Sequence, residues 1–341
     1  MSNEYKNSIL QSVALDLETA KNKPIPDVLR IEVTNGCNDR CIFCGNRKMS
    51  RPISFVKGEI VEKALRQSYE MGVRKVSFYT IGEPFLHPEL SKFVAMAKSI
   101  GFTYSFTNTN GACAKKDSLI AVVNAGISSI AFSINAINPK DYILIHGKND
   151  FESVIEKLIW LNQYRQDNNL DFHLYVSFIK TRLTNYNEDE IREFFSSKCD
   201  EVRIQNVQNI GGFLPEIDLL GVDNSDLYFH YELPCRLIFK SIIVTSEGYL
   251  TACSVDYQNY LVYADLNNDD IPTAWYNKII SGLRNQHLEK NTPGLLCNNC
   301  VNFSKESPNP LINKYSTEFD MSKVLSPCEI NARIEKWRGE I

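Results

Sequence analysis

The stretch Arg30-Ile-Glu-Val-Thr34, followed by Cys37-Asn-Asp-Arg-Cys41-Ile-Phe-Cys44, decides how the rest of the sequence is interpreted. The first part predicts a short β-strand, so the three cysteines lie on a loop at its C-terminal end. In (β/α) barrels this end carries the chemistry, because the loops converge there over the sheet. Three thiolates can hold three irons of a cubane cluster and leave the fourth iron open.

Zinc is the competing interpretation for closely spaced cysteines. A structural zinc site is closed by four ligands, and this loop has neither a histidine nor a fourth cysteine nearby. The loop is therefore a poor structural zinc site.

From residue 30 to about 206, short β-rich runs alternate with helical stretches. Repeated β-then-α units predict an α/β fold with a parallel sheet covered by helices, here a partial (β/α)6 TIM-like barrel. The predicted strands are Arg30–Thr34, Lys75–Tyr79, Phe102–Phe106, Ser129–Ile134, Phe172–Ile179 and Glu201–Gln205. The predicted helices span residues 59–71, 88–100, 117–125, 151–168 and 187–197.

The composition is that of a globular protein, with 43% hydrophobic residues, 23% charged residues and a net charge of −4 among 341 residues. There is no basic footprint for nucleic acid, no apolar run of about 20 residues for a membrane span and no signal-peptide core. We therefore expect a cytoplasmic protein with no nucleic-acid or membrane partner. Ten cysteines, clustered in a reducing compartment, point to metal rather than to disulfides.

A second group of cysteines follows a turn-rich break at residues 209–212. Hairpin strands predicted at 240–245 and 249–252 flank Gly248, and this turn is expected to bring Cys235 and Cys253 onto adjacent strands. Two short helices, near 272–280 and 281–289, lead to Cys297-Asn-Asn-Cys300. Four cysteines fully ligate a [4Fe–4S] cluster, and a four-cysteine zinc ribbon is the alternative.

The CxxxCxΦC pattern, with Phe43 before the last cysteine, resembles the signature of the radical S-adenosylmethionine (SAM) superfamily. The resemblance implies that Cys37, Cys41 and Cys44 hold a [4Fe–4S] cluster whose open iron is chelated by SAM. It further implies that an electron from the cluster cleaves SAM to methionine and a 5′-deoxyadenosyl radical. Phe43 would then lie against the adenine.

Three further motifs follow successive predicted strands in the order that this superfamily uses. Ile81-Gly82-Glu83-Pro84 resembles its GGEP loop, which pairs with the SAM ammonium group, with Ile in place of the first Gly. Thr109-Asn110-Gly111 resembles its TNG motif, and Ser133 matches a serine that contacts the SAM ribose or carboxylate. Asn135 stands where the superfamily usually has Asp. The SAM-binding residues implied by the resemblance are Phe43, Gly82, Glu83, Pro84, Thr109 and Ser133.

The C-terminal cysteines resemble the twitch subdomain, a shortened SPASM domain, with a single auxiliary [4Fe–4S] cluster held by Cys235, Cys253, Cys297 and Cys300. The branch in question includes 2-deoxy-scyllo-inosamine dehydrogenase and related enzymes. We accordingly expect an N-terminal segment (1–29), a radical SAM partial barrel (30–210), a small α+β twitch domain (211–303) and a C-terminal tail (304–341).

The resemblance implies a SAM-dependent oxidoreductase that abstracts a substrate hydrogen and passes an electron to the auxiliary cluster, acting as a dehydrogenase on a sugar, cyclitol or similar small molecule. A maturase that oxidises, crosslinks or epimerises a ribosomal peptide is the alternative, and a non-catalytic iron–sulfur or zinc protein is a third. Either enzyme needs a reductant such as flavodoxin or ferredoxin. No catalytic base is assigned, and the roles of His146 and Cys328 stay open.

Overall fold

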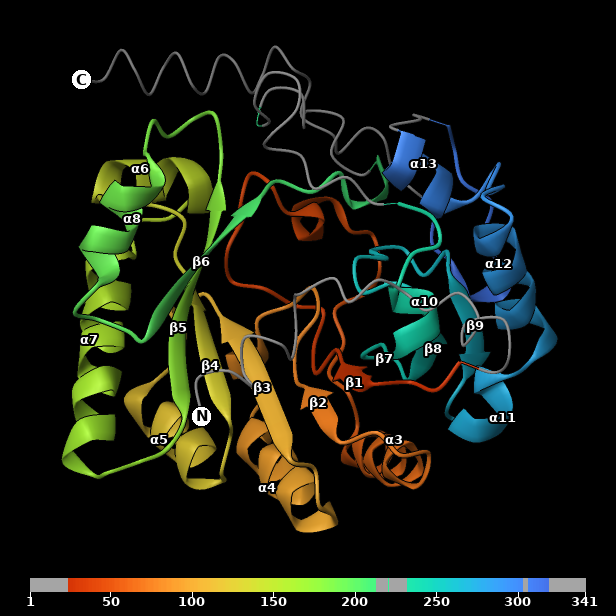
Figure 1. The fold of residues 1–341 in the computed structure, drawn as a ribbon, viewed down its shortest axis with the longest axis horizontal. Coiled ribbons are helices and arrows are strands. Elements are labelled where there is room, and N and C mark those ends of the chain that lie inside the picture. The colour runs from red at the N-terminus through yellow and green to blue at the C-terminus, as the bar shows by residue number, and fades with distance from the viewer. Residues whose placement is uncertain (1–23, 213–219, 221–231, 303–305, 319–341) are drawn as a thin grey trace.

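The computed structural model describes residues 24–212, 220, 232–302 and 306–318, so residues 1–23 of the predicted N-terminal segment, Cys328 and most of the tail lie outside the described residues. The described part forms a mixed α/β structure around one curved sheet (Figure 1). None of its helices combines the length and the apolar character needed to cross a membrane.

The first six strands of the sheet are parallel and lie in chain order, from β1 next to β2 through to β6 at the edge. All six predicted strands are confirmed, with ends that agree or shift by up to three residues. This is the open sheet of a partial TIM-like barrel. The strands are β1 Val28–Ile31, β2 Lys75–Ser77, β3 Tyr104–Thr109, β4 Ser129–Ser133, β5 His173–Lys180 and β6 Glu201–Asn206.

Helices alternate with these strands and lie along the outside of the sheet (Figure 1). The five predicted helices are confirmed, and α6, which the sequence analysis missed, precedes α7. The helices are α3 Gly58–Glu70, α4 Leu90–Ile100, α5 Lys116–Asn124, α6 Pro139–His146, α7 Phe151–Asp167 and α8 Glu188–Phe195, with short 3₁₀ turns η1 Gly45–Lys48, η2 Pro84–Leu86 and η3 Ile210–Gly212.

The sheet continues past the turn-rich break, because β7 (Ser241–Val244) pairs in parallel with β1. Strands β8 (Tyr249–Thr251) and β9 (Val262–Asp265) then extend it antiparallel. The C-terminal region is thus hydrogen-bonded to the first strand of the barrel. Its helices are α10 Leu237–Lys240, α11 Ile271–Trp275, α12 Lys278–Leu288 and α13 Leu296–Asn302, and a further turn, η4, spans Asn313–Tyr315.

One expectation for this region is wrong. Gly248 does form the tight turn between β7 and β8, with φ +88°. However, Cys235 lies before the helix α10, and Cys253 lies in the loop after β8. Neither cysteine is on a strand, because α10 occupies the positions between Cys235 and β7.

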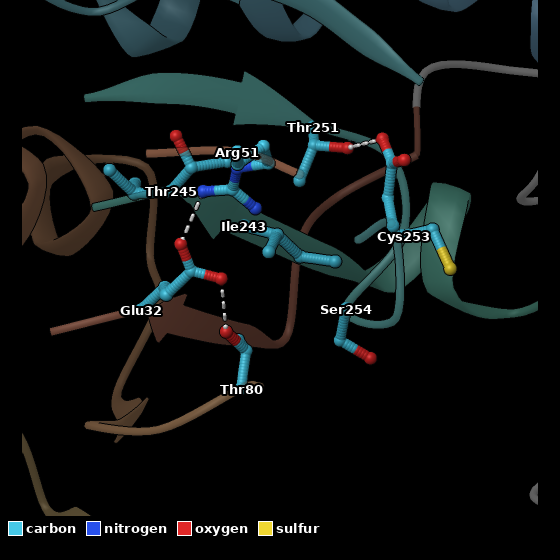
Figure 2. A pocket seen from close by; sticks show the side chains of 10 residues that line it. Glu32, Arg51, Thr80, Ile243, Thr245, Thr251, Cys253 and Ser254 are labelled. Carbon is cyan, nitrogen blue, oxygen red and sulfur yellow. Dashed lines mark hydrogen bonds and ion pairs between the residues drawn. The ribbon is translucent and has the colours of Figure 1, made fainter. Parts of the chain in front are cut away.

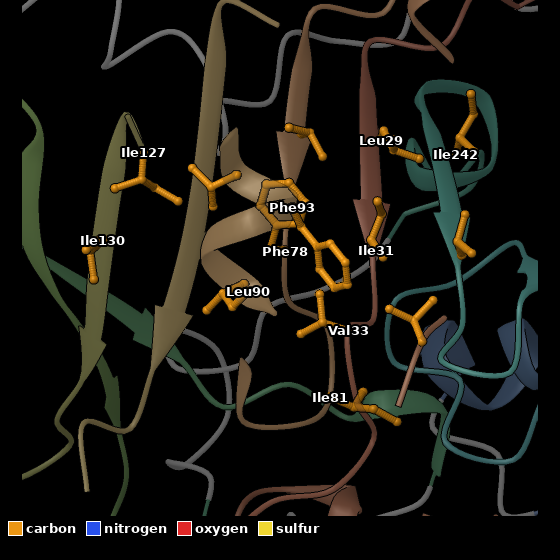
Figure 3. Packing of buried hydrophobic residues seen from close by; sticks show 14 of the residues in the cluster. Leu29, Ile31, Val33, Phe78, Ile81, Leu90, Phe93, Ile127, Ile130 and Ile242 are labelled. Carbon is orange, nitrogen blue, oxygen red and sulfur yellow. The ribbon is translucent and has the colours of Figure 1, made fainter. Parts of the chain in front are cut away.

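The core under the sheet fixes the direction of the strand ends. Figure 3 shows Leu29 and Ile31 of β1 packed with Phe78 and with Phe93 of α4. All four side chains are at most 2% exposed. Burial of this kind contributes about 25 cal/mol per Å2 of apolar surface, so β1 is held firmly and the cysteine loop that follows starts from a rigid strand.

Candidate functional site

Cys37, Cys41 and Cys44, here called the N-terminal cysteine site, occupy the loop between β1 and η1. The loop is docked on the C-terminal end of α6. The Arg40 N–H donates to the His146 carbonyl at 3.2 Å, and the Ile42 N–H donates to the Ile145 carbonyl at 2.9 Å. Because helix C-termini leave carbonyls without partners inside the helix, α6 supplies ready acceptors for this irregular backbone.

The Ile81–Pro84 loop lies directly against the cysteine loop. The Glu83 N–H donates to the Gly36 carbonyl at 2.8 Å. A Cβ atom at Gly82 would lie 2.0 Å from the Thr34 carbonyl oxygen, so only glycine fits there. The departure from the family pattern at Ile81 is tolerated, since its side chain is buried and its carbonyl accepts from the Asn46 amide at 3.0 Å.

The Glu83 carboxylate is buried and held by three donors. One oxygen accepts from the Thr109 hydroxyl at 2.7 Å and from the Phe85 N–H at 3.0 Å, and the other accepts from the Asn110 N–H at 2.8 Å. Burial raises the pKa of Glu83 to about 7, against the opposing effect of these hydrogen bonds. A cationic group beside this carboxylate would relieve the cost of burying it.

The other predicted SAM contacts are placed as follows. Thr109 is buried and its hydroxyl is used by Glu83, so it orients that carboxylate. The Ser133 hydroxyl, at the end of β4, accepts from the Asn135 amide at 3.3 Å. Pro84 begins η2. Phe43 is partly buried and packs against the core.

His146, the last residue of α6, is fully buried beside the N-terminal cysteine site. Its Nδ1 lies 3.0 Å from an Asp39 carboxylate oxygen and 3.5 Å from the Cys41 sulfur. Its Nε2 lies 3.1 Å from the Asn135 amide nitrogen. The ring also stacks on Tyr142, with centroids 4.1 Å apart. The sequence analysis left His146 open because α6, which places it, was not predicted.

Burial raises the pKa of all three thiols, for Cys37 to about 12. Without a metal they are neutral thiols, and a bound cation must displace their protons. The pKa values of Cys113 and Cys199 are also raised by burial, so the grouping of the three thiols, rather than their pKa, indicates a metal site. Three thiols on one loop, next to an oriented buried carboxylate, fit a cluster with an open iron and a bound cationic ligand.

Cys235, Cys253, Cys297 and Cys300, the C-terminal cysteine site, come from three separate segments. Burial raises the pKa of Cys297, and the charges of Cys235 and Cys300 raise it further. Burial also raises the pKa of Cys253, with further contributions from Cys235 and Cys297. These mutual effects indicate that the four side chains lie near one another. His287 supports the site by accepting from the Cys235 N–H at 3.2 Å.

The pair Cys297 and Cys300 lies on α13, which is fixed to the break after β6. The Asn209 amide donates to the Asn299 carbonyl at 2.7 Å. A Cβ atom at Gly211 would lie 2.7 Å from the Leu296 side chain, and Gly211 has φ +72°. Both features require glycine at this position.

The spacing of the sulfurs bears on the choice between zinc and a cluster. In the part of the chain that the structure describes, the group of three or more ligand atoms within 4.8 Å of one another is Asp39, Cys41 and His146. No three of the seven cysteine sulfurs meet that limit. Sulfurs around one tetrahedral zinc lie about 3.8 Å apart, as follows from a Zn–S bond of about 2.3 Å. Among the described residues, the group at this close spacing thus contains one cysteine, Cys41.

The two cysteine sites are joined by the loop after β8, which begins at Cys253. The loop is folded around Asp256, which accepts from the Tyr260 N–H at 2.9 Å and the Leu261 N–H at 2.7 Å. Tyr257 is 5% exposed, and its hydroxyl lies 3.6 Å from the Cys44 sulfur. Nothing in the sequence indicated this contact, because it joins residues 213 positions apart.

A charged cluster ties the same regions together, and its buried members Glu32 and Arg51 line a small cavity (Figure 2). Arg51 donates to Glu32, at the end of β1, at 2.6 Å and to Glu247, in the β7–β8 turn, at 2.9 Å. Glu32 also accepts from the Thr80 hydroxyl at 3.1 Å. Burial alone would raise the pKa of Glu247, but the Arg51 charge outweighs it and holds the pKa below its usual value.

Comparison with known proteins bears directly on these loops. The family model described as the radical SAM superfamily matches residues 31–197. The GTP 3′,8-cyclase of Chlorobaculum tepidum is 34% identical over 135 residues, which are 39% of this chain and 40% of that protein. The chain thus spans about two fifths of the length of this curated relative.

Solved structures share the fold over more than the matched domain. BtrN in complex with AdoMet and 2-DOIA has a TM-score of 0.55 at 18% identity, covering 85% of this chain and 99% of BtrN. Streptococcus suis SuiB bound to the precursor peptide SuiA has a TM-score of 0.61 at 16% identity, covering 79% of this chain and 69% of SuiB. Residues 31–197 therefore match the radical SAM superfamily, and the solved structures show that the wider chain shares their fold.

Proposed function

We propose that this protein is a radical SAM dehydrogenase that oxidises a sugar, cyclitol or similar small molecule and uses a second [4Fe–4S] cluster as the electron acceptor. The observation that carries the proposal is the C-terminal cysteine site, where four partly buried cysteines lie near enough for their charges to raise one another's pKa. Four thiolates occupy every iron of a cubane. Such a cluster has no open iron for substrate, so electron transfer is the use left to it.

When bound, the N-terminal cluster and SAM would supply radical chemistry for removing a substrate hydrogen atom, and the second cluster would supply an acceptor for the remaining electron as the substrate hydroxyl loses its proton. The chain's own residues prepare the N-terminal site for this. Cys37, Cys41 and Cys44 would hold the first cluster. The remaining lone pair of the Glu83 carboxylate would accept from the SAM ammonium group, and Thr109 keeps that carboxylate in place.

The fraction of each solved structure that this chain matches supports the small-molecule interpretation. BtrN, whose solved complex contains 2-DOIA, is matched over 99% of its length. The SuiB complex with a precursor peptide is matched over 69% of its length. The likeness to SuiB is the reason to retain a ribosomal-peptide maturase as the second candidate.

The test is an anaerobic assay of the reconstituted, reduced protein with SAM and deuterated candidate substrates: aminocyclitols, sugars, GTP and ribosomal precursor peptides. Mass spectrometry follows deuterium into 5′-deoxyadenosine and the mass of the product. We expect label from a cyclitol or sugar, with a product two hydrogens lighter than the substrate.

Other outcomes overturn the proposal in distinguishable ways. Label delivered only from a peptide establishes the maturase. Label delivered only from GTP assigns the activity named for the curated relatives. Variants that lack the four cysteines of the C-terminal site can be tested in the same assay. If they still cleave SAM and complete the oxidation, the second cluster takes no part in the reaction.

A further inference from the structure

We propose that each thiolate of the N-terminal cysteine site accepts a hydrogen bond from one buried side chain of another part of the fold, and that these three donors set the reduction potential of the cluster. The donors are Asn110 for Cys37, His146 for Cys41 and Tyr257 for Cys44. The inference rests on the proposed function in one respect, since it requires the three cysteines to hold a cluster.

The proton on His146 can be placed from the hydrogen bonds around it. The Asn135 side-chain oxygen accepts from the Ile179 N–H at 2.7 Å, which turns the Asn135 NH2 group toward His146 Nε2 at 3.1 Å. Because that NH2 can only donate, Nε2 is the acceptor and Nδ1 carries the proton. Nδ1–H then faces Asp39 at 3.0 Å and Cys41 at 3.5 Å.

This arrangement also gives a reason for asparagine at position 135, where the superfamily pattern has Asp. A carboxylate there would offer Nε2 only acceptors and draw the proton to that nitrogen. Asn135 therefore acts through His146, as a positioning residue that keeps the donor on the side of Cys41.

Asn110 is oriented by the turn that follows β3. Its side-chain oxygen accepts from the Ala112 N–H at 2.9 Å. Its NH2 group is thereby directed to the Asn38 oxygen at 3.0 Å and to the Cys37 sulfur at 3.8 Å. The TNG motif thus serves two purposes, since its backbone binds Glu83 and its Asn side chain reaches the cysteine loop.

Tyr257 reaches Cys44 from the C-terminal region. Its ring lies so close to Gly45 that a Cβ atom there would be 2.7 Å from a ring carbon. Once iron has displaced the thiol proton, the Cys44 sulfur can only accept, so the Tyr257 hydroxyl at 3.6 Å must donate. Tyr257 is four residues after Cys253, so one loop carries a ligand of the second site and a donor to the first.

Hydrogen bonds to cluster sulfurs are among the features that set the potential of an iron–sulfur centre. A donor draws negative charge from the thiolate and so favours the reduced, more negative cluster. The three donors act on three different sulfurs of one cluster. Each is therefore expected to raise the reduction potential of that cluster.

The experiment is an EPR-monitored redox titration of the anaerobically reconstituted full-length protein. The cluster in question is recognised by the change that added SAM causes in its EPR signal, and the C-terminal cluster serves as an internal reference. Y257F removes only the hydroxyl. H146L removes the Nδ1 donor, whereas H146N retains an N–H near the same position. Y263F is the matched control, because the buried Tyr263 hydroxyl has no hydrogen-bond partner among the described residues.

We expect the SAM-responsive cluster to become harder to reduce in Y257F and in H146L, with a larger shift in the double variant than in either single variant. H146N should recover most of the shift, and Y263F should leave the potential unchanged. The iron content should stay at the wild-type level in Y257F and H146N.

An unchanged potential in Y257F and H146L with the cluster fully loaded overturns the inference and leaves the proposed function standing. Loss of a single metal equivalent in both His146 variants also overturns it, because Asp39, Cys41 and His146 would then be the ligands of a mononuclear metal. Wild-type protein without any SAM-responsive cluster would instead remove the proposed function itself.

Discussion

The two cysteine sites are built in different ways. The N-terminal site uses three cysteines within eight residues, on one loop between β1 and η1. The C-terminal site draws four cysteines from three segments that are separated by up to 62 positions before α13 closes it. The first is local in its ligands and non-local in its hydrogen-bond donors, whereas the second is non-local in its ligands.

The contrast has a physical consequence. A loop on a rigid strand end can present its ligands before the C-terminal region has folded, while the C-terminal site exists only once β7 has paired with β1 and α13 has docked on η3. Removing ligands from each site in turn therefore tests whether the two sites have separate roles.

The largest effect is expected from replacing Cys37, Cys41 and Cys44 together by alanine. The open-iron cluster then has no ligands, so formation of 5′-deoxyadenosine from SAM should be abolished. Iron and sulfide analysis should show that the variant keeps the iron and sulfide of the proposed C-terminal cluster. Full iron content and a SAM-responsive EPR signal in this variant would contradict the assignment of the N-terminal site.

The double variant C297A/C300A should separate the two halves of the reaction. Under the proposed function, SAM cleavage and hydrogen abstraction depend on the N-terminal site and should persist, whereas net oxidation of the substrate should be lost with its proposed electron acceptor. The readouts are 5′-deoxyadenosine and oxidised product from the same reaction. C199A is the control, because the Cys199 thiol donates to the Glu201 carbonyl at 3.3 Å, at the β6 edge of the sheet. Loss of both products in C297A/C300A, with normal N-terminal iron, would contradict separate roles.

Breaking the charged cluster between the two regions should cost stability. In R51M the buried carboxylate of Glu32 and the partly buried carboxylate of Glu247 lose their cation, and removing one partner of a buried pair such as Arg51–Glu32 costs about 3–5 kcal/mol. Anaerobic urea denaturation measures the loss. R66M is the matched control, because Arg66 pairs with Glu62 on the exposed face of α3 and such pairs contribute below about 1 kcal/mol. Equal losses in both variants would show that Arg51 does not connect the regions.

The sequence was sufficient for the barrel strands and for the three-cysteine loop, because both depend on local pattern. It was insufficient for α6, whose apolar pattern is weak. The start and end signals of that helix were nevertheless present: the Asn138 side chain accepts from the Asp141 N–H, Pro139 is the first helical residue, and Gly147 ends the helix with φ +74°.

Tertiary contacts account for what no local pattern could give. The parallel pairing of β7 with β1 joins residues more than 200 positions apart. The contact of Tyr257 with Cys44 follows from that pairing and from the fold of the loop around Asp256. Glu83, in contrast, was recognised from its motif, and the structure adds the donors that orient it.

A smaller effect is expected for E83Q. The variant keeps the shape of the side chain but removes the charge that would bind the SAM ammonium group. Since a hydrogen bond to a charged group contributes about 1.5–3 kcal/mol, SAM affinity should fall by roughly ten- to a hundredfold. Equilibrium binding to the cluster-loaded protein measures it, and the EPR signal of the C-terminal cluster should not change. Unaltered affinity would mean that Glu83 does not contact SAM.

The smallest effect concerns pH and the loop that carries Glu83. Burial lowers the pKa of His87 below its usual 6.5, more than the neighbouring Glu89 raises it. His87 is held neutral, with one ring nitrogen donating to the Val56 carbonyl at 3.1 Å and the other accepting from the Glu89 N–H at 3.1 Å.

The unfolded chain binds a proton at His87 below pH 6.5, whereas the folded chain binds it only at lower pH. The stability that neutral His87 provides is therefore complete above pH 6.5 and is lost as the pH falls toward its folded pKa. In H87Q this part of the pH dependence should disappear. The slope of the unfolding free energy against pH should therefore decrease, by at most about 1.4 kcal/mol per pH unit. Urea denaturation between pH 5 and 8 measures it. An unchanged slope would show that groups other than His87 cause the pH dependence of the unfolding free energy.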